Sequence, residues 1–249
     1  MKKGLKKFSF NAKVLVALAA ICTLFVFETK AQDAAKPEKK TSFILGVRTG
    51  VNANKLLVSH TGSSEWYSGA QGTIFGLFNF NNWVGVSLEA GVSQSGGAGV
   101  RYESSNPSYG KGTIDFRLTN IQANLLSHFK LPVLSVYEPR LILGPSFDFN
   151  TFASGNTEGM VGQSGVKYSY DATQAFQPVD VGAIVGLGVD FDLKFAKLFV
   201  DARYRHGLFD VNQLQGTTNA RAVSSAMQNY DVRTRGISVQ VGLGFKLGK

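Results

Sequence analysis

Apolar residues recur at every second position along most of the chain after about residue 42. The pattern is clearest in segments 83–93, 179–191 and 236–248, where aliphatic residues on one face oppose glycine and polar residues on the other. A period of two is typical of β-strands with two unlike faces. Eight such segments can be drawn: 43–51, 71–80, 83–93, 113–130, 140–150, 179–191, 197–207 and 236–248. The sequence therefore predicts an all-β chain.

The connections between these segments alternate in length. Residues 52–70, 94–112, 151–178 and 208–235 are long connections, and residues 81–82, 131–139 and 192–196 are short ones. Outer-membrane barrels show this alternation, with short periplasmic turns and long extracellular loops. Strands of about nine to eleven residues can also cross the hydrocarbon core when they are tilted. The expected fold is an eight-stranded antiparallel up-and-down transmembrane β-barrel.

The alternation does not say which face of the sheet points outward, because a soluble lipocalin-type barrel is apolar inside and polar outside. The polar face of this chain is rich in glycine and in charges of both signs. A hydrated sheet surface favours Thr, Lys and Glu over glycine, which weakens strands. Glycine suits a narrow, crowded interior instead, so the membrane barrel is the favoured interpretation and the soluble barrel is the alternative.

The segment 113–130 contains a change of phase. Its apolar residues lie at positions 114, 116 and 118, and then at 121, 123 and 125. A shift of one residue moves every side chain to the opposite face of a sheet. A β-bulge near Asn120 is the simplest interpretation of this change.

The N-terminal residues have the order of a secretory signal peptide. Five lysines surround or precede an apolar core at Val14–Phe27, which is followed by the small residue Ala31. The core is too short for a membrane-spanning helix, which needs about 20 residues, and it suits a cleaved signal. We expect a signal peptide at 1–31, a periplasmic lead-in at 32–41 and the outer-membrane β-barrel domain at 42–249. An uncleaved N-terminal anchor is the alternative.

Export changes the charge of the chain. The whole sequence has a net charge of +9, but residues 1–31 contain six lysines and one glutamate, so the mature chain has 20 basic and 16 acidic residues, a net charge of +4. A nucleic-acid-binding role thereby loses its main support. The single cysteine, Cys22, leaves with the signal peptide. We therefore expect no disulfide, and no cofactor or metal either.

With the apolar face toward lipid, the polar face places charges of both signs inside the barrel. A barrel of about eight strands is narrow enough to be filled by its own side chains, and a buried charge without a partner is costly. We expect a structural ion-pair network, and a narrow charge-lined conduit is the alternative. The expected network consists of Arg48, Glu89, Asp115, Arg117, Arg140, Asp148, Asp180, Asp190, Asp201, Arg203, Arg205 and Lys246.

Aromatic residues gather in the long connections, where they suit the binding of a partner or a glycan. They could equally pack on one another and close the mouth of the barrel. The expected partners are outer-membrane lipid and lipopolysaccharide, together with other envelope proteins. The candidate binding residues are Trp66, Tyr67, Tyr102, Tyr109, Tyr168 and Tyr170.

The positions of the three histidines give little support to a catalytic site. His60, His128 and His206 fall in different parts of the expected barrel, and no metal-ligand spacing is present in the sequence. Some outer-membrane lipid-modifying enzymes and proteases place His, Ser and acidic residues near the outer rim. His206 with Asp210 is therefore the one pairing to test, and the leading interpretation is a protein without catalytic residues.

Four segments resemble a known family: LILGPSFDF (141–149), VGAIVGLGVDF (181–191), LFVDARYRHGL (198–208) and ISVQVGLGFKLG (237–248). They resemble the outer-membrane β-barrel domain family common in Bacteroidota, described as porin-like or PorT-type, over residues 41–249. The resemblance implies an eight-stranded barrel, a signal peptide and an outer-membrane location. One branch, the PorT-type proteins, is associated with the type IX secretion apparatus.

The leading functional hypothesis is a non-enzymatic barrel with a structural or loop-mediated binding role in the cell envelope. A small porin or solute channel and a component of a secretion apparatus are the main alternatives. A lipid-modifying enzyme is the least favoured of the hypotheses.

Overall fold

The computed structural model describes residues 41–59, 62–103, 111–131, 137–160, 163–193, 195–213 and 231–247. The expected signal peptide, and all but the last residue of the expected lead-in, lie outside these ranges. Among the described residues, no helix is long and apolar enough to cross a membrane.

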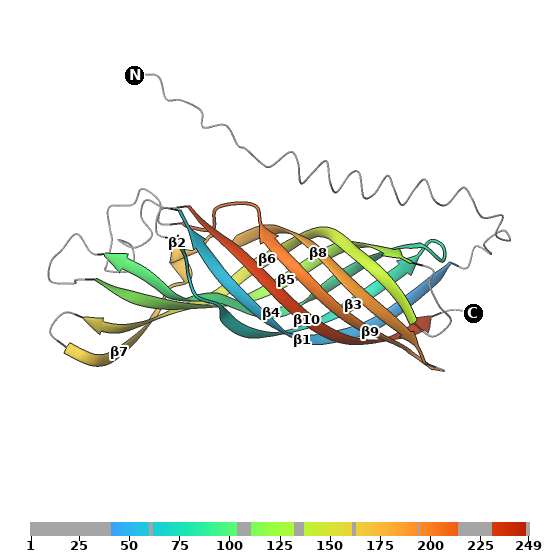
Figure 1. Ribbon diagram of the computed structural model, residues 1–249, viewed down its shortest axis with the longest axis horizontal. Helices are drawn as coiled ribbons and strands as arrows, with labels where there is room; N and C mark the ends of the chain where they lie inside the picture. Colours follow the sequence, from blue (N-terminus) through green and yellow to red (C-terminus); the bar gives the residue numbers. More distant parts are fainter. Residues whose placement is uncertain are drawn as a thin grey trace, which may run out of the picture. The chain divides into compact units, whose positions relative to one another are not determined.

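Strands form where the sequence alternates, and eight of them make a continuous wall (Figure 1). Two short elements, β2 (Gly62–Ser63) and the 3-10 helix η2 (Thr173–Ala175), and the strand β7 (Gln163–Asp171) lie outside that wall. The wall strands are β1 (Ser42–Val58), β3 (Tyr67–Asn79), β4 (Val84–Glu103), β5 (Lys111–Lys130), β6 (Tyr137–Met160), β8 (Val179–Asp192), β9 (Lys197–Gly207) and β10 (Val232–Leu247).

The wall closes on itself. Each strand pairs antiparallel with the next along the chain, in the order β1-β3-β4-β5-β6-β8-β9-β10. The first and last strands also pair along their whole length, from Phe43 opposite Leu247 to Val58 opposite Val232. Closure leaves no unpaired edge at the level where all eight strands pair. The predicted eight-stranded antiparallel barrel is confirmed.

The two faces of the wall differ as the membrane interpretation requires. Large aliphatic side chains are widely exposed on the outside, for example Leu88 at 64% and Leu187 at 66%. The inside holds buried polar and charged groups, among them Arg48 and Glu89. An apolar band around the outside and a polar inside are the arrangement of an outer-membrane barrel, and the reverse of the soluble alternative.

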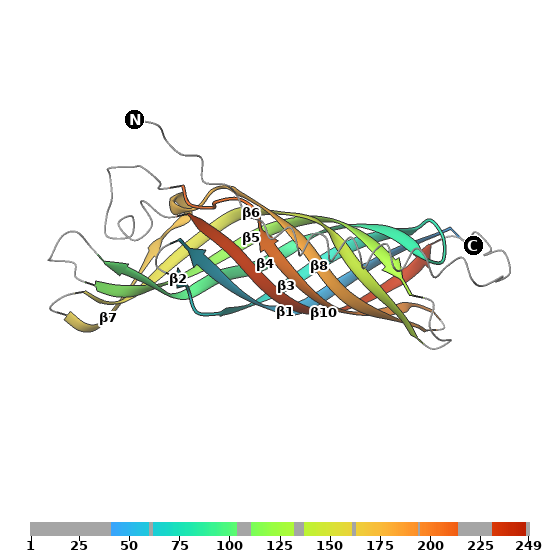
Figure 2. The same cartoon turned by 45° about the horizontal axis from the view of Figure 1, so that its top comes forward.

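The two ends of the barrel differ in their connections (Figures 1 and 2). Residues 80–83, 131–136 and 193–196 join strands at the end where β1 begins and β10 ends. Asn81 closes the first of these turns, because its side-chain oxygen accepts backbone hydrogen bonds from Trp83 (2.7 Å) and Val84 (2.8 Å). Short turns are periplasmic in such barrels, so the opposite end, with the long connections, is extracellular.

Much of what the sequence predicts to be loop is strand. On the extracellular side β1, β4 and β6 continue well past the predicted ends, β5 begins two residues before its predicted start, and β7 pairs with the outer part of β6. In this outer part of β5 the apolar residues Ile114, Phe116 and Leu118 point inward, while Asp115 and Arg117 are exposed. The alternation persists there with its faces exchanged, and from the sequence alone this exchange looks like the shift of phase for which a bulge was predicted.

The predicted bulge exists, but it lies in the neighbouring strand. The register shifts where Thr119 pairs with Phe152 and Asn120 pairs with Asn150, which leaves Thr151 of β6 as the extra residue. The hydroxyl of Thr151 donates to the carbonyl of Thr119 at 2.7 Å. In β5 itself the even-numbered residues point inward from Ile114 to His128, so the prediction of a bulge within β5 was wrong.

Candidate functional site

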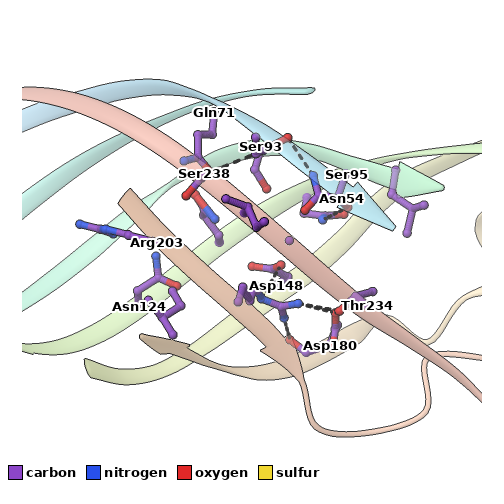
Figure 3. A pocket seen from close by; sticks show the side chains of 18 of the residues that line it. Asn54, Gln71, Ser93, Ser95, Asn124, Asp148, Asp180, Arg203, Thr234 and Ser238 are labelled. Atoms are coloured by element: carbon purple, nitrogen blue, oxygen red, sulfur yellow. Dashed lines mark hydrogen bonds and ion pairs between the residues drawn. The ribbon is translucent and has the colours of Figure 1, made fainter. Parts of the chain in front are cut away.

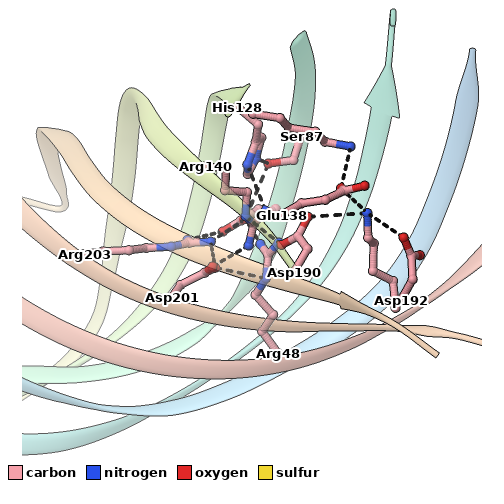
Figure 4. Close-up of polar contacts among 12 residues, drawn as sticks. Arg48, Ser87, His128, Glu138, Arg140, Asp190, Asp192, Asp201 and Arg203 are labelled. Carbon is pink, nitrogen blue, oxygen red and sulfur yellow. Dashed lines mark hydrogen bonds and ion pairs between the residues drawn. The ribbon is translucent and has the colours of Figure 1, made fainter. Parts of the chain in front are cut away.

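A charged cluster fills the middle of the barrel (Figure 4). Glu89 of β4 accepts hydrogen bonds from both terminal nitrogens of Arg203, at 2.7 and 3.0 Å, and it also pairs with Arg48. Asp201 lies 2.9 Å from Arg203 and 3.4 Å from Arg48. The two carboxylates therefore bind the same two guanidinium groups, which come from opposite parts of the chain.

Arg140 of β6 extends the cluster. Its Nε lies 2.9 Å from Asp190, and its Nη2 pairs with Asp201. All six side chains are 0–3% exposed, and the cluster contains three cations and three anions. Buried charges are tolerated when each has a partner, and here every charge has at least one. We call these six residues the central charge cluster: Arg48, Glu89, Arg140, Asp190, Asp201 and Arg203.

Aromatic rings support the cluster on its periplasmic side. The guanidinium of Arg48 lies 3.9 Å from the centroid of Phe75, and that of Arg140 lies 4.9 Å from Phe199. The two rings meet edge to face at 5.2 Å, and Ile44 and Leu77 complete a small apolar layer. Cation–π contact is stronger in a desolvated site, so the two rings help to hold both guanidinium groups in place.

Glycine makes room for these large side chains. A Cβ atom on Gly188 would lie 2.8 Å from Nε of Arg140, and one on Gly242 would lie 2.4 Å from Cγ of Arg48. Any larger residue at these positions would displace the arginines. The glycine-rich polar face of the sequence thus reflects close packing inside a narrow barrel.

His128 contacts the central charge cluster, and the direction of its hydrogen bond to Ser87 is not the one that would activate the serine as a nucleophile. Its Nδ1 lies 3.0 Å from Arg140, and its Nε2 lies 2.7 Å from the hydroxyl of Ser87. A guanidinium can only donate, so Nδ1 accepts and the ring proton is on Nε2, which donates to Ser87. In a catalytic pair the hydroxyl donates to the imidazole. Ser87 and His128, both fully buried, are therefore structural.

A second charged group lies closer to the extracellular end. Arg205 is 3.2 Å from Asp148 and 2.9 Å from Asp180, and Thr234 donates to Asp180 at 2.6 Å. These residues border a cavity of about 50 Å³ with mostly polar walls (Figure 3). One oxygen of each aspartate has no protein partner. The cavity has room for a few water molecules, which would satisfy those oxygens, and it is too small for a typical solute.

An apolar plug closes the extracellular mouth. Two segments outside the wall fold inward there, and they pair through Gln177 N to Val211 O at 2.8 Å and Gln213 N to Ala175 O at 3.1 Å. Phe176 meets Phe116 of β5 edge to face at 5.2 Å. The plug consists of Leu56, Val58, Val100, Ile114, Phe116, Leu118, Ala153, Ala172, Ala175, Phe176, Val211 and Val232.

The structure brings nine of the twelve expected interior residues into these two groups. It places the other three elsewhere, and their expected interior position was wrong. Asp115 and Arg117 are exposed on the outer part of β5, because the sheet there is hydrated outside and apolar inside. Lys246 has the inward parity but lies at the periplasmic rim, where its side chain is 57% exposed and pairs with Asp192 at 3.0 Å.

Sequence reasoning missed some members of the interior. Glu138 accepts from Lys197 at 2.5 Å near the periplasmic mouth, and His128 belongs to the central charge cluster's surroundings. Both have the inward parity of their strands. Glu138 shares the parity of Arg140 but precedes the predicted start of that strand, so a longer strand would have found it.

The aromatic candidates lie at the extracellular end. Trp66 is 46% exposed, and the amine of Lys55 lies 4.9 Å from its ring. Tyr67 begins β3, Tyr102 lies in β4, and Tyr168 and Tyr170 lie in β7 opposite Thr157 and Gly155. Tyr109 lies outside the described residues. The expected loop residues are therefore mostly strand residues.

The structure does not join the one candidate catalytic pair. The ring of His206 lies 3.4 Å from the hydroxyl of Tyr204. Asp210 accepts backbone hydrogen bonds from Asn212 (2.9 Å) and Val232 (2.7 Å). The described part of the chain also contains no group of three His, Cys, Asp or Glu side chains that could hold a metal ion.

Comparison with known families agrees with this geometry. The family model described as outer membrane protein beta-barrel domain matches residues 30–213. The chain belongs to this family. With the closed wall and the apolar outer band, membership makes it an outer-membrane β-barrel protein. No curated protein sequence matches the chain.

Solved structures of other outer-membrane proteins are similar in fold to this member of the family. Neisserial surface protein A (NspA) is 17% identical, with 81% of this chain and 97% of that chain covered and a TM-score of 0.41. OprG from Pseudomonas aeruginosa is 15% identical, with 87% and 100% covered and a TM-score of 0.43. Ail, the attachment invasion locus protein of Yersinia pestis, is 13% identical, with 81% and 98% covered and a TM-score of 0.38.

Proposed function

We propose that this outer-membrane β-barrel protein has no catalytic activity and binds a protein partner outside the cell. The observation that carries the proposal is a sheet that begins at the level of the plug and projects beyond it. β4 and β5 pair out to Glu103 opposite Lys111, β5 and β6 pair out to Thr113 opposite Glu158, and β7 adds a further strand to β6. We call this part, with residues 99–103, 111–117, 153–160 and 163–171, the extracellular sheet (Figures 1 and 2).

The extracellular sheet offers an edge to a partner. β7 pairs with β6 on one side, and in the described part of the chain no strand pairs with its other side. An unpaired edge presents backbone N–H and C=O groups that an extended segment of another protein can bind. Tyr168 and Tyr170 lie on this strand, and tyrosine is enriched where proteins contact one another.

The interior of the barrel supports a binding role over transport. The central charge cluster, the small cavity and the apolar plug follow one another along the lumen. A solute would have to break several buried ion pairs and displace the plug. The reversed Ser87–His128 hydrogen bond and the separated His206 and Asp210 side chains support the absence of catalysis.

The resemblance of segments 141–149 and 198–208 to PorT-type proteins of Bacteroidota favours one more specific candidate. In that case the partner is a component of a secretion apparatus. We also propose that residues 1–31 are removed on export, which N-terminal sequencing of the outer-membrane form tests.

Site-specific photo-crosslinking tests the binding role. A photoreactive residue replaces Ser169, which is exposed on β7, and a control protein has it at Leu88 in the lipid-facing band. We expect a discrete protein adduct at position 169 in intact cells and only lipid adducts at position 88. Shortening the β6–β7 hairpin, by joining the paired residues Thr157 and Tyr168 through Asn-Gly, should abolish that adduct.

Two results would overturn the proposal. An adduct at position 169 that persists in the shortened hairpin would mean that the edge strand does not select the partner. Discrete and stable conductance of the purified protein in a planar bilayer would show that the lumen opens and would favour the porin alternative.

A further inference from the structure

The outer surface of three neighbouring strands changes from apolar to basic at one level near the extracellular end. On β10 the outward residues from Phe245 up to Ile237 are aliphatic or aromatic and about half exposed, and the next two outward residues are Arg235 and Arg233. On β1 the outward run ends at Val51 and Ala53 and is followed by Lys55. The apolar band of the barrel thus ends in a basic row.

The strand register brings these cations together. Lys55 pairs with Arg235 across β1 and β10, and Arg235 pairs with His206 across β10 and β9. Arg233 follows two positions further along β10, opposite Leu57. Side chains of directly opposite residues lie on the same face with Cβ atoms about 4.5–5.5 Å apart, so the row crosses three strands.

Acidic residues are absent from the outward positions of the three strands that hold Lys55, Arg235 and His206. The first acidic residue beyond them is Asp231, which precedes β10. The arginines inside the barrel, in contrast, are paired with carboxylates. Within the residues that the structure describes, Lys55 and Arg235 form no ion pair, and Nε of Arg235 has no hydrogen-bond acceptor.

Two aromatic side chains mark the level of the row. Lys55 lies against the exposed ring of Trp66, and Tyr204 of β9 is opposite Ile237, one step below the cations. Trp and Tyr concentrate where the hydrocarbon core meets the headgroups. The basic row therefore lies at headgroup level in the outer leaflet.

A hollow on the lipid-facing side lies directly below the row. Its volume is about 530 Å³, and it is lined by Val51, Ala53, Ala70, Ile237 and Val239 together with Asn52, Ser68, Gly69, Gln94 and Ser238. Small side chains on β1 and β3 leave this space, and aliphatic side chains of β10 border it. A ligand that fits both features has an anionic head above an acyl chain.

We propose that Lys55, Arg235 and His206, with Arg233 beside them, bind the phosphate group of an acylated glycolipid of the outer leaflet, such as lipid A, with one acyl chain in the hollow below. Arginine binds phosphate through two parallel hydrogen bonds, and lysine contributes a point charge. The site is independent of the extracellular sheet, since it lies on the other side of the barrel wall from β5 and β6 in the strand order.

The test measures lipid binding to the folded mature protein in detergent by native mass spectrometry. The double variant Lys55→Gln/Arg235→Gln is compared with Arg117→Gln/Lys246→Gln, which likewise removes two positive charges, here from exposed side chains away from the proposed site. We expect the apparent affinity for phosphorylated lipid A to fall at least about tenfold in the first variant and to stay within about twofold in the second. A similar fall in both variants would show non-specific attraction and overturn the site.

A series of ligands tests the phosphate-binding part of the proposed site in the unaltered protein, and one variant tests the hollow. The unaltered protein should bind phosphorylated lipid A at least about tenfold more tightly than dephosphorylated lipid A. Inorganic phosphate at millimolar concentration should not displace the lipid, because it has no acyl chain. Equal binding of both lipid forms, or displacement by inorganic phosphate, would overturn the proposal. Ala70→Leu, which fills the hollow and leaves every charge in place, should weaken binding of the phosphorylated lipid.

Discussion

In both halves of strand β5 the even-numbered residues point into the barrel, but these inward residues are largely polar in one half and apolar in the other. In the periplasmic half the inward residues include Asn120, Asn124 and His128, and the outward residues include Ile121 and Leu125. In the extracellular half the inward residues are Ile114, Phe116 and Leu118, and the outward residues are Asp115 and Arg117. The exchange occurs at about residue 119 without any break in the strand.

The exchange follows the surroundings of the wall. Where lipid covers the outside, apolar side chains point outward and the polar ones must find partners inside. Where water covers the outside, the sheet behaves like part of a soluble protein and buries its apolar face. One barrel thus has a polar core in its lower half and a hydrophobic core, the plug, in its upper half.

We expect the stability of the protein to be most sensitive to the loss of one member of a buried ion pair in the polar core. Glu89→Ala leaves Arg48 and Arg203 buried with only Asp201 between them. Removing one member of a buried pair costs about 3–5 kcal/mol. We expect the urea midpoint of the protein folded in lipid vesicles to fall accordingly, and heat-induced unfolding on a gel to occur at lower temperature.

The rim provides the matched control for that variant. Asp192→Ala also removes a carboxylate from an ion pair, but Asp192 is 48% exposed, and exposed pairs contribute about 0–1 kcal/mol. Equal destabilisation by the two variants would mean that burial is not what makes the central charge cluster sensitive.

The hydrophobic core of the upper half is tested by Phe116→Ala. Phe116 is fully buried against Phe176, and truncating a buried phenylalanine costs about 3–5 kcal/mol. Because the plug also holds residues 172–178, an added protease should cut that segment in intact cells faster than in the unaltered protein. Ile121→Ala, which removes a lipid-facing side chain of the same strand, should leave that cutting rate unchanged.

A series of arginine substitutions along β5 can locate the level at which the outside of the strand changes from lipid to water. Arginine on the lipid face costs about 2–4 kcal/mol at the membrane midplane and about 0–1 kcal/mol near the interface. We expect the cost to be largest for Leu125→Arg, smaller for Ile121→Arg and near zero for Thr113→Arg, which is already exposed beyond the boundary. A large cost for Thr113→Arg would place lipid against the extracellular sheet and contradict the comparison.

The same boundary explains what sequence could and could not predict of the fold. The alternation predicts the eight wall strands because lipid and a narrow lumen impose opposite preferences on alternate residues. It does not predict the extracellular sheet, because the exchange of faces at residue 119 looks like a change of phase. The sequence alone therefore predicts that the apolar residues at 114, 116 and 118 face lipid, whereas they point inward.

The sequence predicts which residues lie inside the barrel only as far as their odd or even place along a strand decides whether the side chain points inward. Parity correctly placed Arg48, Glu89 and Arg203 in the lumen, because their strands keep one face toward lipid. It does not give the height along the barrel, so Lys246 was expected inside although it lies at the rim. Partner choice was also beyond the sequence, since it depends on which residues of distant strands meet across the lumen.

The smallest expected effect concerns the hydrated half. The side chain and backbone N–H of Thr173 both donate to Asp171, at 2.6 and 2.8 Å, and these hydrogen bonds hold the pKa of Asp171 below its usual value. A depressed pKa contributes stability above the ordinary aspartate pKa, and this contribution is lost as the pH falls through the folded value. Thr173→Val should raise the pKa of Asp171 toward its usual value, and Thr173→Ser should not, as measured by NMR of the side-chain carboxyl. Asp171 is fully exposed, so the effect on stability should be small. A pKa that stays low in Thr173→Val would mean that the backbone N–H of residue 173, and not the hydroxyl, sets it.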